Sequence, residues 1–206
     1  MYVPGHFAID DHATMISFMR ANSFALLTTC AEDGPFVSHL TLLHVEGGGA
    51  YGRLVGHMAR ANPQWRHFAS GMPALVVFWG PHAYISPAWY ETANQVPTWN
   101  YQTVHAYGLP RIVEPQDEVL ETLRALVDTF EGGFETPWRM GGLPAGQAAA
   151  MTRGIVAFEI PIDHLEGKAK LSQNKTVRDR ELAAERLEAL GGEDNARTAA
   201  LMRATI

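Results

Sequence analysis

Short apolar segments separated by glycine- and proline-containing turns limit this chain to a narrow set of folds. Residues 24–29, 36–45 and 74–79 each have the length and composition of a buried strand. The triplet Gly47-Gly48-Gly49 separates the segment at 36–45 from another at 50–56 and favours a hairpin between them. Turns this short join antiparallel neighbours, whereas parallel strands need a crossover of a dozen or more residues.

Further strands are expected at 101–113 and 154–160, and a turn at 32–35. With the segments above, this makes six or more strands of mostly antiparallel type, closed or sandwiched. The predicted fold class is therefore mainly β with peripheral helices.

Helical patterns are fewer. Apolar residues on one face predict a helix over 116–131, and residues 62–70 are expected to be helical, with Pro63 in the tolerated first turn. The C-terminus predicts two helices, at 176–190 and from 194 onward. Their apolar stripes are too narrow for us to expect core helices there.

Composition excludes several classes of protein. Of 206 residues, 47% are hydrophobic and 18% are charged, which excludes a disordered chain. Acidic residues outnumber basic ones by 22 to 16, which argues against binding nucleic acid through bulk charge. The single cysteine, Cys30, excludes an intramolecular disulfide. With no targeting or membrane-spanning segment in the sequence, we expect a cytoplasmic protein without membrane contact.

Charge is distributed unevenly. Residues 1–167 hold eight arginines, no lysine and sixteen acidic residues, a net charge of −8. Residues 168–206 hold eight basic and six acidic residues, a net charge of +2, and all three lysines. A basic tail on an acidic body is typical of a tail that meets an anion, although a solvated helix surface explains its distal part equally well.

The segment 67–110 is the strongest anomaly in the sequence. Glu91 is its only charged residue, yet it holds nine of the twenty aromatic residues, with histidine, serine, threonine and asparagine between them. A core would not need so many hydrogen-bonding groups. An interface of a homodimer and a pocket for a flat heteroaromatic ligand both combine aromatic surface with few charges, and together they explain the pattern.

Two polar segments have the composition of anion-binding sites. His57, Arg60 and Asn62 follow a strand and precede a probable helix, where side-chain donors and backbone N–H groups suit a phosphate. Residues 168–175 gather all the lysines with serine, glutamine and asparagine, in what we expect to be a turn for an anionic or carbonyl-bearing group.

Other motifs are excluded. Gly47, Gly49 and Gly52 match the spacing of a dinucleotide fingerprint, but they connect two strands and no helix follows to bind a pyrophosphate. His39 and His44 lie five residues apart on one expected strand, so they point to opposite faces and cannot share a metal ion. We therefore expect no metal.

The sequence resembles the PaiB-type negative transcriptional regulators, a family of FMN-binding proteins. The similarity covers nearly the whole chain and is most specific from Gly80 to Gly108. The matching segments are Met1-Tyr2-Val3-Pro4, Gly56-His57, Asn62-Pro63-Gln64-Trp65-Arg66, Gly80-Pro81-His82-Ala83-Tyr84-Ile85-Ser86-Pro87, Trp89-Tyr90, Val96-Pro97-Thr98-Trp99-Asn100-Tyr101, His105-Ala106-Tyr107-Gly108 and Lys170-Leu171-Ser172-Gln173-Asn174. The resemblance implies a split β-barrel over residues 1–170, with 171–206 as a C-terminal helical extension, and a homodimer that holds flavin between subunits.

The resemblance also implies which residues bind FMN. The strand beside the isoalloxazine would contribute Ser38, His39, Leu40 and Thr41. The phosphate end would contribute His57, Arg60 and Asn62, with Gln64 in the same site. Lys170, Ser172 and Gln173 would close it, from the same or the partner chain. Flavin oxidases of this fold commonly carry Arg, Lys and Ser at the phosphate turn, whereas here Ala61 and Asn62 accompany Arg60. We therefore expect FMN to be weakly bound.

Three functions stay open at this point. The first is a flavin- or small-molecule-responsive regulator, whose DNA contact, if direct, would fall on Arg178, Arg180, Arg186, Arg197 and Arg203. The second is a flavin-dependent oxidoreductase, in which a histidine (His39, His57 or His82) would donate the proton; no catalytic residue can be named. Haem binding through an axial histidine is the third.

Overall fold

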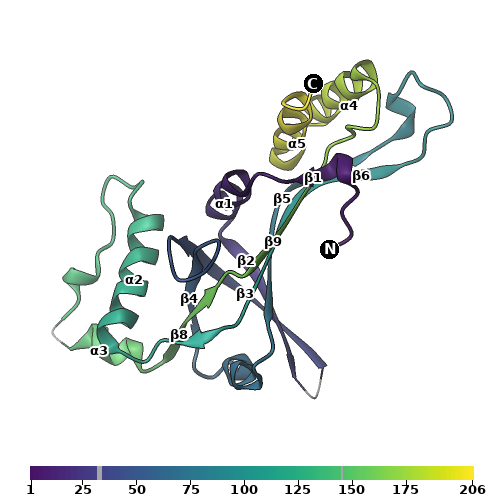
Figure 1. Cartoon of the computed structure of the whole chain (residues 1–206). Helices are drawn as coiled ribbons and strands as arrows, with labels where there is room; N and C mark the ends of the chain where they lie inside the picture. The colour runs from purple at the N-terminus through teal and green to yellow at the C-terminus, as the bar shows by residue number, and fades with distance from the viewer. Residues whose placement is uncertain (32–33, 145) are drawn as a thin grey trace. The chain divides into compact units, whose positions relative to one another are not determined.

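The computed structural model describes residues 1–31, 34–144 and 146–206 (Figure 1). Glu32 and Asp33, in the turn expected at 32–35, lie outside the described residues. The chain divides into two compact units. The first unit contains Met1–Phe18, Phe78–His105 and Glu166–Ile206, and the second unit contains Met19–Val77 and Ala106–Leu165. The expected division into 1–170 and 171–206 stays a prediction.

The first unit is a sheet with two helices at its C-terminal end. Its strand order is β1-β9-β6-β5, with β1 antiparallel to β9. In Figure 1 the helices α4 and α5 lie side by side. The elements are β1 (Ala8–Ile9), the start of α1 (His12–Ala21), most of β5 (Ala74–Ile85) and β6 (Thr98–Gly108), β9 (His164–Lys170), α4 (Val177–Leu190) and α5 (Glu193–Arg203), with short 3-10 helices η1 (Gly5–Phe7) and η3 (Pro87–Trp89).

The second unit has the strand order β5-β2-β3-β4-β8-β7, and every ladder described in it is antiparallel. Its helices α2 and α3 contact each other, and α2 also packs on β4. The elements are β2 (Phe24–Ala31), β3 (Gly34–Val45), β4 (Arg53–Ala59), η2 (Pro63–Ser70), the start of β5, β7 (Arg111–Ile112), α2 (Gln116–Glu131), η4 (Met140–Gly142), α3 (Gln147–Thr152) and β8 (Ile155–Pro161).

Strand β3 belongs to two ladders and so bends the sheet of the second unit. Its first part pairs with β2, from Gly34 to Thr41, and its last four residues pair with β4. Gly56 on β4 lies opposite Leu42, where a Cβ atom would come within 2.5 Å of the Leu42 side chain. A residue without a side chain therefore permits the close approach that this change of partner requires.

The fold class predicted from the sequence is confirmed: antiparallel strands dominate and the helices are peripheral. The helix predicted over 116–131 is α2, with the same bounds. Asn62 caps η2 by accepting a hydrogen bond from the Gln64 backbone N–H, and Pro63 occupies the first turn as expected.

Three expectations about strands were wrong in part. The strand expected at 50–56 begins only at Arg53, because Gly47, Gly48 and Gly52 have positive φ and extend the loop. The strand expected over 101–113 is interrupted by Leu109-Pro110. Lys168 and Lys170 lie on strand β9 and not in a turn.

The expectation that the C-terminal helices carry no core was also wrong. Ala183, Ala184 and Leu187 of α4 are fully buried and form a hydrophobic cluster with Ala199 and Met202 of α5. Ala83 and Ile85 of β5 and Leu171, directly after β9, complete this cluster. Alanine is only weakly hydrophobic, so it hardly widens the apolar stripe that the sequence shows. Its small side chain nevertheless lets two helices approach closely, which is why this core was not expected.

A buried carboxylate fastens α4 to the segment before β6. Asp179 is 1% exposed and accepts hydrogen bonds from the backbone N–H of Glu91 (2.8 Å), the N–H of Thr92 (3.2 Å) and the Thr92 hydroxyl (2.5 Å). Burial by itself would raise the pKa of Asp179, but the hydrogen bonds from Thr92, Thr176 and Glu91 lower it below its ordinary value.

Replacing Asp179 by alanine should lower the free energy of unfolding at pH 7 by about 2–3 kcal/mol, because buried donors lose a charged acceptor. Since folding lowers this pKa, the contribution is complete above about pH 4 and disappears as the pH falls through the folded value. Urea unfolding from pH 7 to pH 3 would measure both effects, with the exposed Asp10→Ala variant as control. Equal stability of the two variants would contradict the role given to Asp179.

Candidate functional site

In the second unit, a polar network joins β2, β3 and η2. The Asn62 side chain donates to the Ser38 hydroxyl at 2.8 Å, and its oxygen accepts from the Gln64 backbone N–H at 3.0 Å. The Gln64 side chain is completely buried and donates to Leu27 O (2.9 Å), Phe36 O (3.0 Å) and the Thr29 hydroxyl (3.2 Å). The network fixes Ser38, Asn62 and Gln64 relative to one another.

His57 lies on β4, opposite Ala157 of β8. Its Nδ1 atom is buried and has no hydrogen-bond partner among the described residues. Burial lowers the pKa of His57 below the ordinary histidine value. The ring is therefore neutral at pH 7 and has an unpaired nitrogen. The Oε1 atom of Gln64 is likewise buried without a partner among the described residues, and such groups call for a ligand or water.

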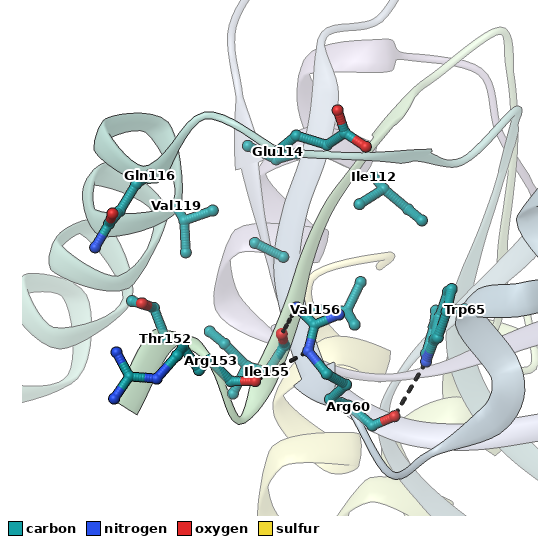
Figure 2. Close-up of a pocket in the computed structure, with 12 residues that line it drawn as sticks. Arg60, Trp65, Ile112, Glu114, Gln116, Val119, Thr152, Arg153, Ile155 and Val156 are labelled. Carbon is teal, nitrogen blue, oxygen red and sulfur yellow. Dashed lines mark hydrogen bonds between the residues drawn. The ribbon is translucent and has the colours of Figure 1, made fainter. Parts of the chain in front are cut away.

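Arg60 is held in place by backbone carbonyls at the start of β8. Its Nε donates to Arg153 O at 2.9 Å and its Nη2 donates to Ile155 O at 2.7 Å. These two bonds leave three of the five guanidinium N–H donors for another partner. Trp65 Nε1 donates to Arg60 O at 3.1 Å, so the loop that leads into η2 is fixed at both the side chain and the backbone of Arg60 (Figure 2).

The other candidate residues on β3 are spread over both faces of the strand. Ser38 is buried, whereas His39 is exposed, and Leu40 and Thr41 are half-buried. Because side chains alternate along a strand, Ser38 and Leu40 share one face and His39 and Thr41 share the other. The network of Asn62 and Gln64 therefore reaches Ser38 but not its neighbours.

In the first unit, Lys170 and its neighbours form a second polar group. Lys170 donates to Trp99 O at 2.7 Å and to the Thr98 hydroxyl. Burial lowers the pKa of Lys170, and the nearby charges of Lys168 and Lys175 lower it further. A lysine in this environment favours an anion nearby, because an anion would offset both effects.

Ser172 and Gln173 define the turn after β9. Ser172 is buried and has a left-handed backbone, with φ of 65°. Its hydroxyl exchanges hydrogen bonds with the Asn100 amide at 3.0 and 3.2 Å and lies 3.3 Å from the Tyr90 hydroxyl. Gln173 bridges Ala169 O and the Leu171 N–H. The side chains of Ser172 and Gln173 thus bond within this unit, and their role toward a flavin stays a prediction.

The sequence analysis missed four residues that support these groups. The Thr29 hydroxyl contacts His67 Nδ1 at 3.0 Å as well as Gln64, and Asn100 and Tyr90 surround Ser172. Asn100 and Tyr90 lie inside the specific segment from Gly80 to Gly108, which was a usable signal. No local pattern marks Thr29 or His67, because the residues that they contact are distant in the sequence.

The cations of the C-terminal helices are mostly paired within the chain. Arg180 is buried and donates to Thr205 O at 2.7 Å. Three others form ion pairs: Arg178 with Glu91, Arg197 with Glu193, and Arg203 with Glu188. Of the five arginines named for DNA contact, Arg186 alone has no such partner among the residues that the structure describes.

Neither a metal cluster nor a membrane helix is found in the described part of the chain. No group of three or more His, Cys, Asp or Glu residues there could hold a metal ion. No helix described there has the length and apolar character to cross a bilayer.

The family profile described as "Putative FMN-binding domain" matches residues 1–164. The chain belongs to this FMN-binding family. A relative from Bacillus subtilis (strain 168), "Protease synthase and sporulation protein PAI 2", is 37% identical over 179 residues, which cover 87% of this chain and 85% of the relative. The family resemblance found in the sequence is therefore confirmed.

Solved structures share the fold of this FMN-binding family member. The flavocytochrome Anf3 from Azotobacter vinelandii aligns with a TM-score of 0.62 at 15% identity, over 82% of this chain and 72% of that one. An FAD and heme binding protein from Mycobacterium smegmatis aligns with a TM-score of 0.61 at 17% identity, over 90% and 80%. These similarities confirm the split-barrel fold.

The second unit has donors that fit FMN, the cofactor that the family implies. His57 has an unpaired ring nitrogen, Arg60 has unused N–H donors, and both precede the Asn62 cap of η2. A flavin phosphate needs cationic and N–H donors, and a flavin ring needs a few placed hydrogen-bonding groups. The residues present are therefore compatible with FMN.

The neutral state of His57 predicts a pH dependence of stability. Because folding lowers its pKa, stability should be complete above about pH 6.5 and fall as the pH drops toward the folded value. In His57→Leu, unfolding by urea should depend less on pH between pH 7.5 and pH 5. His105, whose pKa burial also lowers, should retain part of the dependence. The exposed His6→Leu variant is the control, and an unchanged dependence in His57→Leu would disprove the buried neutral ring.

Proposed function

We propose that this chain is an FMN-binding regulatory protein that works as a cytoplasmic homodimer and responds to flavin or to another small molecule. Family membership supports the cofactor. The Bacillus relative is named for protease synthase and sporulation, and because sporulation is a cellular programme and not a single reaction, the name supports a regulatory role. A single cysteine is consistent with a reducing compartment.

The observation that carries the flavin assignment is the buried, unpaired Nδ1 of His57. An orphaned polar atom inside a folded unit costs free energy unless a ligand or water pairs with it. The segment that follows His57 supplies the other donors: the Arg60 guanidinium and the N-terminal end of η2 at Asn62. We propose that these residues, with Ser38 on the neighbouring strand, hold FMN.

When bound, FMN supplies a redox-active isoalloxazine ring. The protein groups bind and orient it: His57 offers a neutral imidazole nitrogen, and Arg60 offers N–H donors whose direction two backbone carbonyls fix. His39, Leu40, Thr41, Gln64, Lys170, Ser172 and Gln173 stay predicted site residues. We keep residues 1–170 as the proposed flavin-binding domain and 171–206 as its helical extension.

Direct DNA contact through the C-terminal helices is disfavoured by the pairing of their arginines. Ion pairs and hydrogen bonds within the chain engage Arg178, Arg180, Arg197 and Arg203. A protein gains affinity for DNA by releasing counterions through cations that reach phosphates; the buried Arg180 is not available for this, and the partner carboxylates lower the positive potential around the other three arginines. We propose that regulation works through the flavin-dependent state of the protein and not through these helices alone.

An exposed aromatic patch on the first unit supports the proposed homodimer. Trp99 is 54% exposed and Tyr84 is 45% exposed, with ring centroids 6.0 Å apart, and His82 lies 6.0 Å from Trp99. The patch belongs to the charge-poor segment 67–110. Aromatic surface without charge is enriched at the centres of protein interfaces.

Titration with FMN tests the proposed function. The full chain should quench flavin fluorescence at saturation, and His57→Leu should bind at least about tenfold more weakly, because a buried hydrogen bond to the ligand is lost. His6→Leu should bind like the unchanged protein. No uptake of FMN by the unchanged chain would refute the proposal. Steady turnover of reduced nicotinamide by the bound flavin would instead favour an oxidoreductase.

The homodimer is tested separately. Light scattering at micromolar concentration should find two chains per particle for the unchanged protein and one for Trp99→Asp, because a buried unpaired carboxylate is costly at an interface. Phe134→Asp changes an aromatic of the second unit that is 63% exposed, somewhat more than Trp99, and should leave the dimer intact. Single chains in the unchanged protein would end the dimer proposal.

A further inference from the structure

A pocket of about 580 Å³ lies in the second unit, where β7, β8, the loop before η2 and the start of α2 meet. In Figure 2, Trp65 and Ile112 lie on one side of it, Val119 and Thr152 on the other, and the Arg60 guanidinium between them. Its volume falls within the roughly 300–1,000 Å³ of sites that hold small organic ligands.

The walls of this pocket combine an aromatic ring, aliphatic side chains and a net positive charge. Trp65 and Ile112 provide apolar surface, and Ile112 is 41% exposed. The charged side chains in the wall are Arg60, Arg153 and Glu114, a net charge of +1. This contrasts with the net charge of −8 over residues 1–167.

Two side chains of the pocket wall, Arg60 and Trp65, are held in place by hydrogen bonds within the protein, without a ligand. Arg60 is fixed by Arg153 O and Ile155 O, at 2.9 and 2.7 Å. The Trp65 indole is fixed by its bond to Arg60 O, and the Arg66 guanidinium lies 5.4 Å from the ring centroid. A preorganised cation beside a preorganised ring loses little conformational entropy when it binds.

We propose that this pocket is a second small-molecule site, separate from the flavin, and that it takes a planar aromatic carboxylate. The ring packs against Trp65 and the aliphatic wall, and the carboxylate accepts hydrogen bonds from the unused N–H donors of Arg60, with Arg153 adding charge. A guanidinium and a carboxylate are both planar and carry opposite charges, so they form paired hydrogen bonds. A carboxylate on Arg60 is therefore the strongest polar contact that the wall offers.

This proposal goes beyond the flavin assignment and does not depend on it. Of the residues proposed to hold FMN, Arg60 is the one that also lines this pocket. Ser38, Asn62 and His57 belong to the network on β3 and β4, whereas the pocket is walled by β7, β8 and α2. The two sites would therefore meet at Arg60 and share its three unused N–H donors.

Isothermal titration of the full chain with 1-naphthoate, with and without saturating FMN, tests the second site. The expected dissociation constant is on the order of 1 mM or tighter, as for a small ligand of ordinary binding efficiency. Arg153→Gln should weaken binding about tenfold, and Glu114→Gln should tighten it severalfold, since both change one exposed charge in the wall. Naphthylmethylamine, with the same ring and a positive charge, should bind at least about tenfold more weakly.

Arg124→Gln is the matched control, because it removes an exposed arginine of α2 that does not line the pocket. It should change the affinity less than about twofold. The proposal is overturned if 1-naphthoate does not bind, if Arg153→Gln and Arg124→Gln bind it alike, or if FMN displaces it competitively. A failure of FMN to bind leaves the naphthoate result unaffected, so the two proposals fail separately.

Discussion

The buried amide of Gln64 is the interaction on which the second unit depends. Its Nε2 donates to carbonyls on two neighbouring strands, Leu27 O and Phe36 O, and so fixes η2 against the β2–β3 ladder. Gln64 has no exposed surface, so water cannot replace a lost donor there. The Gln64 backbone N–H donates to the Asn62 side-chain oxygen, and the Asn62 side chain in turn donates to the Ser38 hydroxyl. A substitution of Gln64 would therefore also disturb the hydrogen bond from Asn62 to Ser38, although Ser38 is not one of the groups to which the Gln64 amide donates.

Charge in the first unit is used to hold the chain together. Lys168 donates to Tyr2 O, and its ammonium lies 5.3 Å from the Tyr101 ring centroid. Asp179 accepts hydrogen bonds from the backbone N–H groups of Glu91 and Thr92. The lysine-rich start of the basic tail is thus engaged in internal contacts, whereas several arginines of α4 and α5 keep exposed surface. The sequence alone cannot separate these two outcomes, because net charge is the same whether a cation faces solvent or a carbonyl.

Local patterns predicted the parts of the fold that depend on neighbouring residues. The bounds of α2 follow from apolar periodicity, and the helical segment at 62–70 with Pro63 in its first turn follows from local sequence, although the role of Asn62 as its cap was not predicted. Lys168 was misplaced because the group that accepts its hydrogen bond, Tyr2 O, lies 166 residues away. The core formed by Ala183 and Ala199 was missed because small residues pack closely without a strong apolar signal. The same limit applies to the site, whose network partners Thr29 and His67 carry no local signature.

The five residues from Arg60 to Gln64 connect the proposed carboxylate pocket with the proposed flavin site. At its start, the Arg60 side chain is bonded to the backbone of β8, and near its end Asn62 and Gln64 are bonded to β3 and β2. A ligand that binds Arg60 can influence a flavin held by His57 and Asn62 only if its affinity differs between two arrangements of this loop. The short span leaves few backbone torsions to absorb a shift, so a movement of the Arg60 backbone would be shared by the Asn62 cap. A regulator that responds to a small molecule needs coupling between its two ligand sites, whereas an enzyme that uses a bound flavin can work without it.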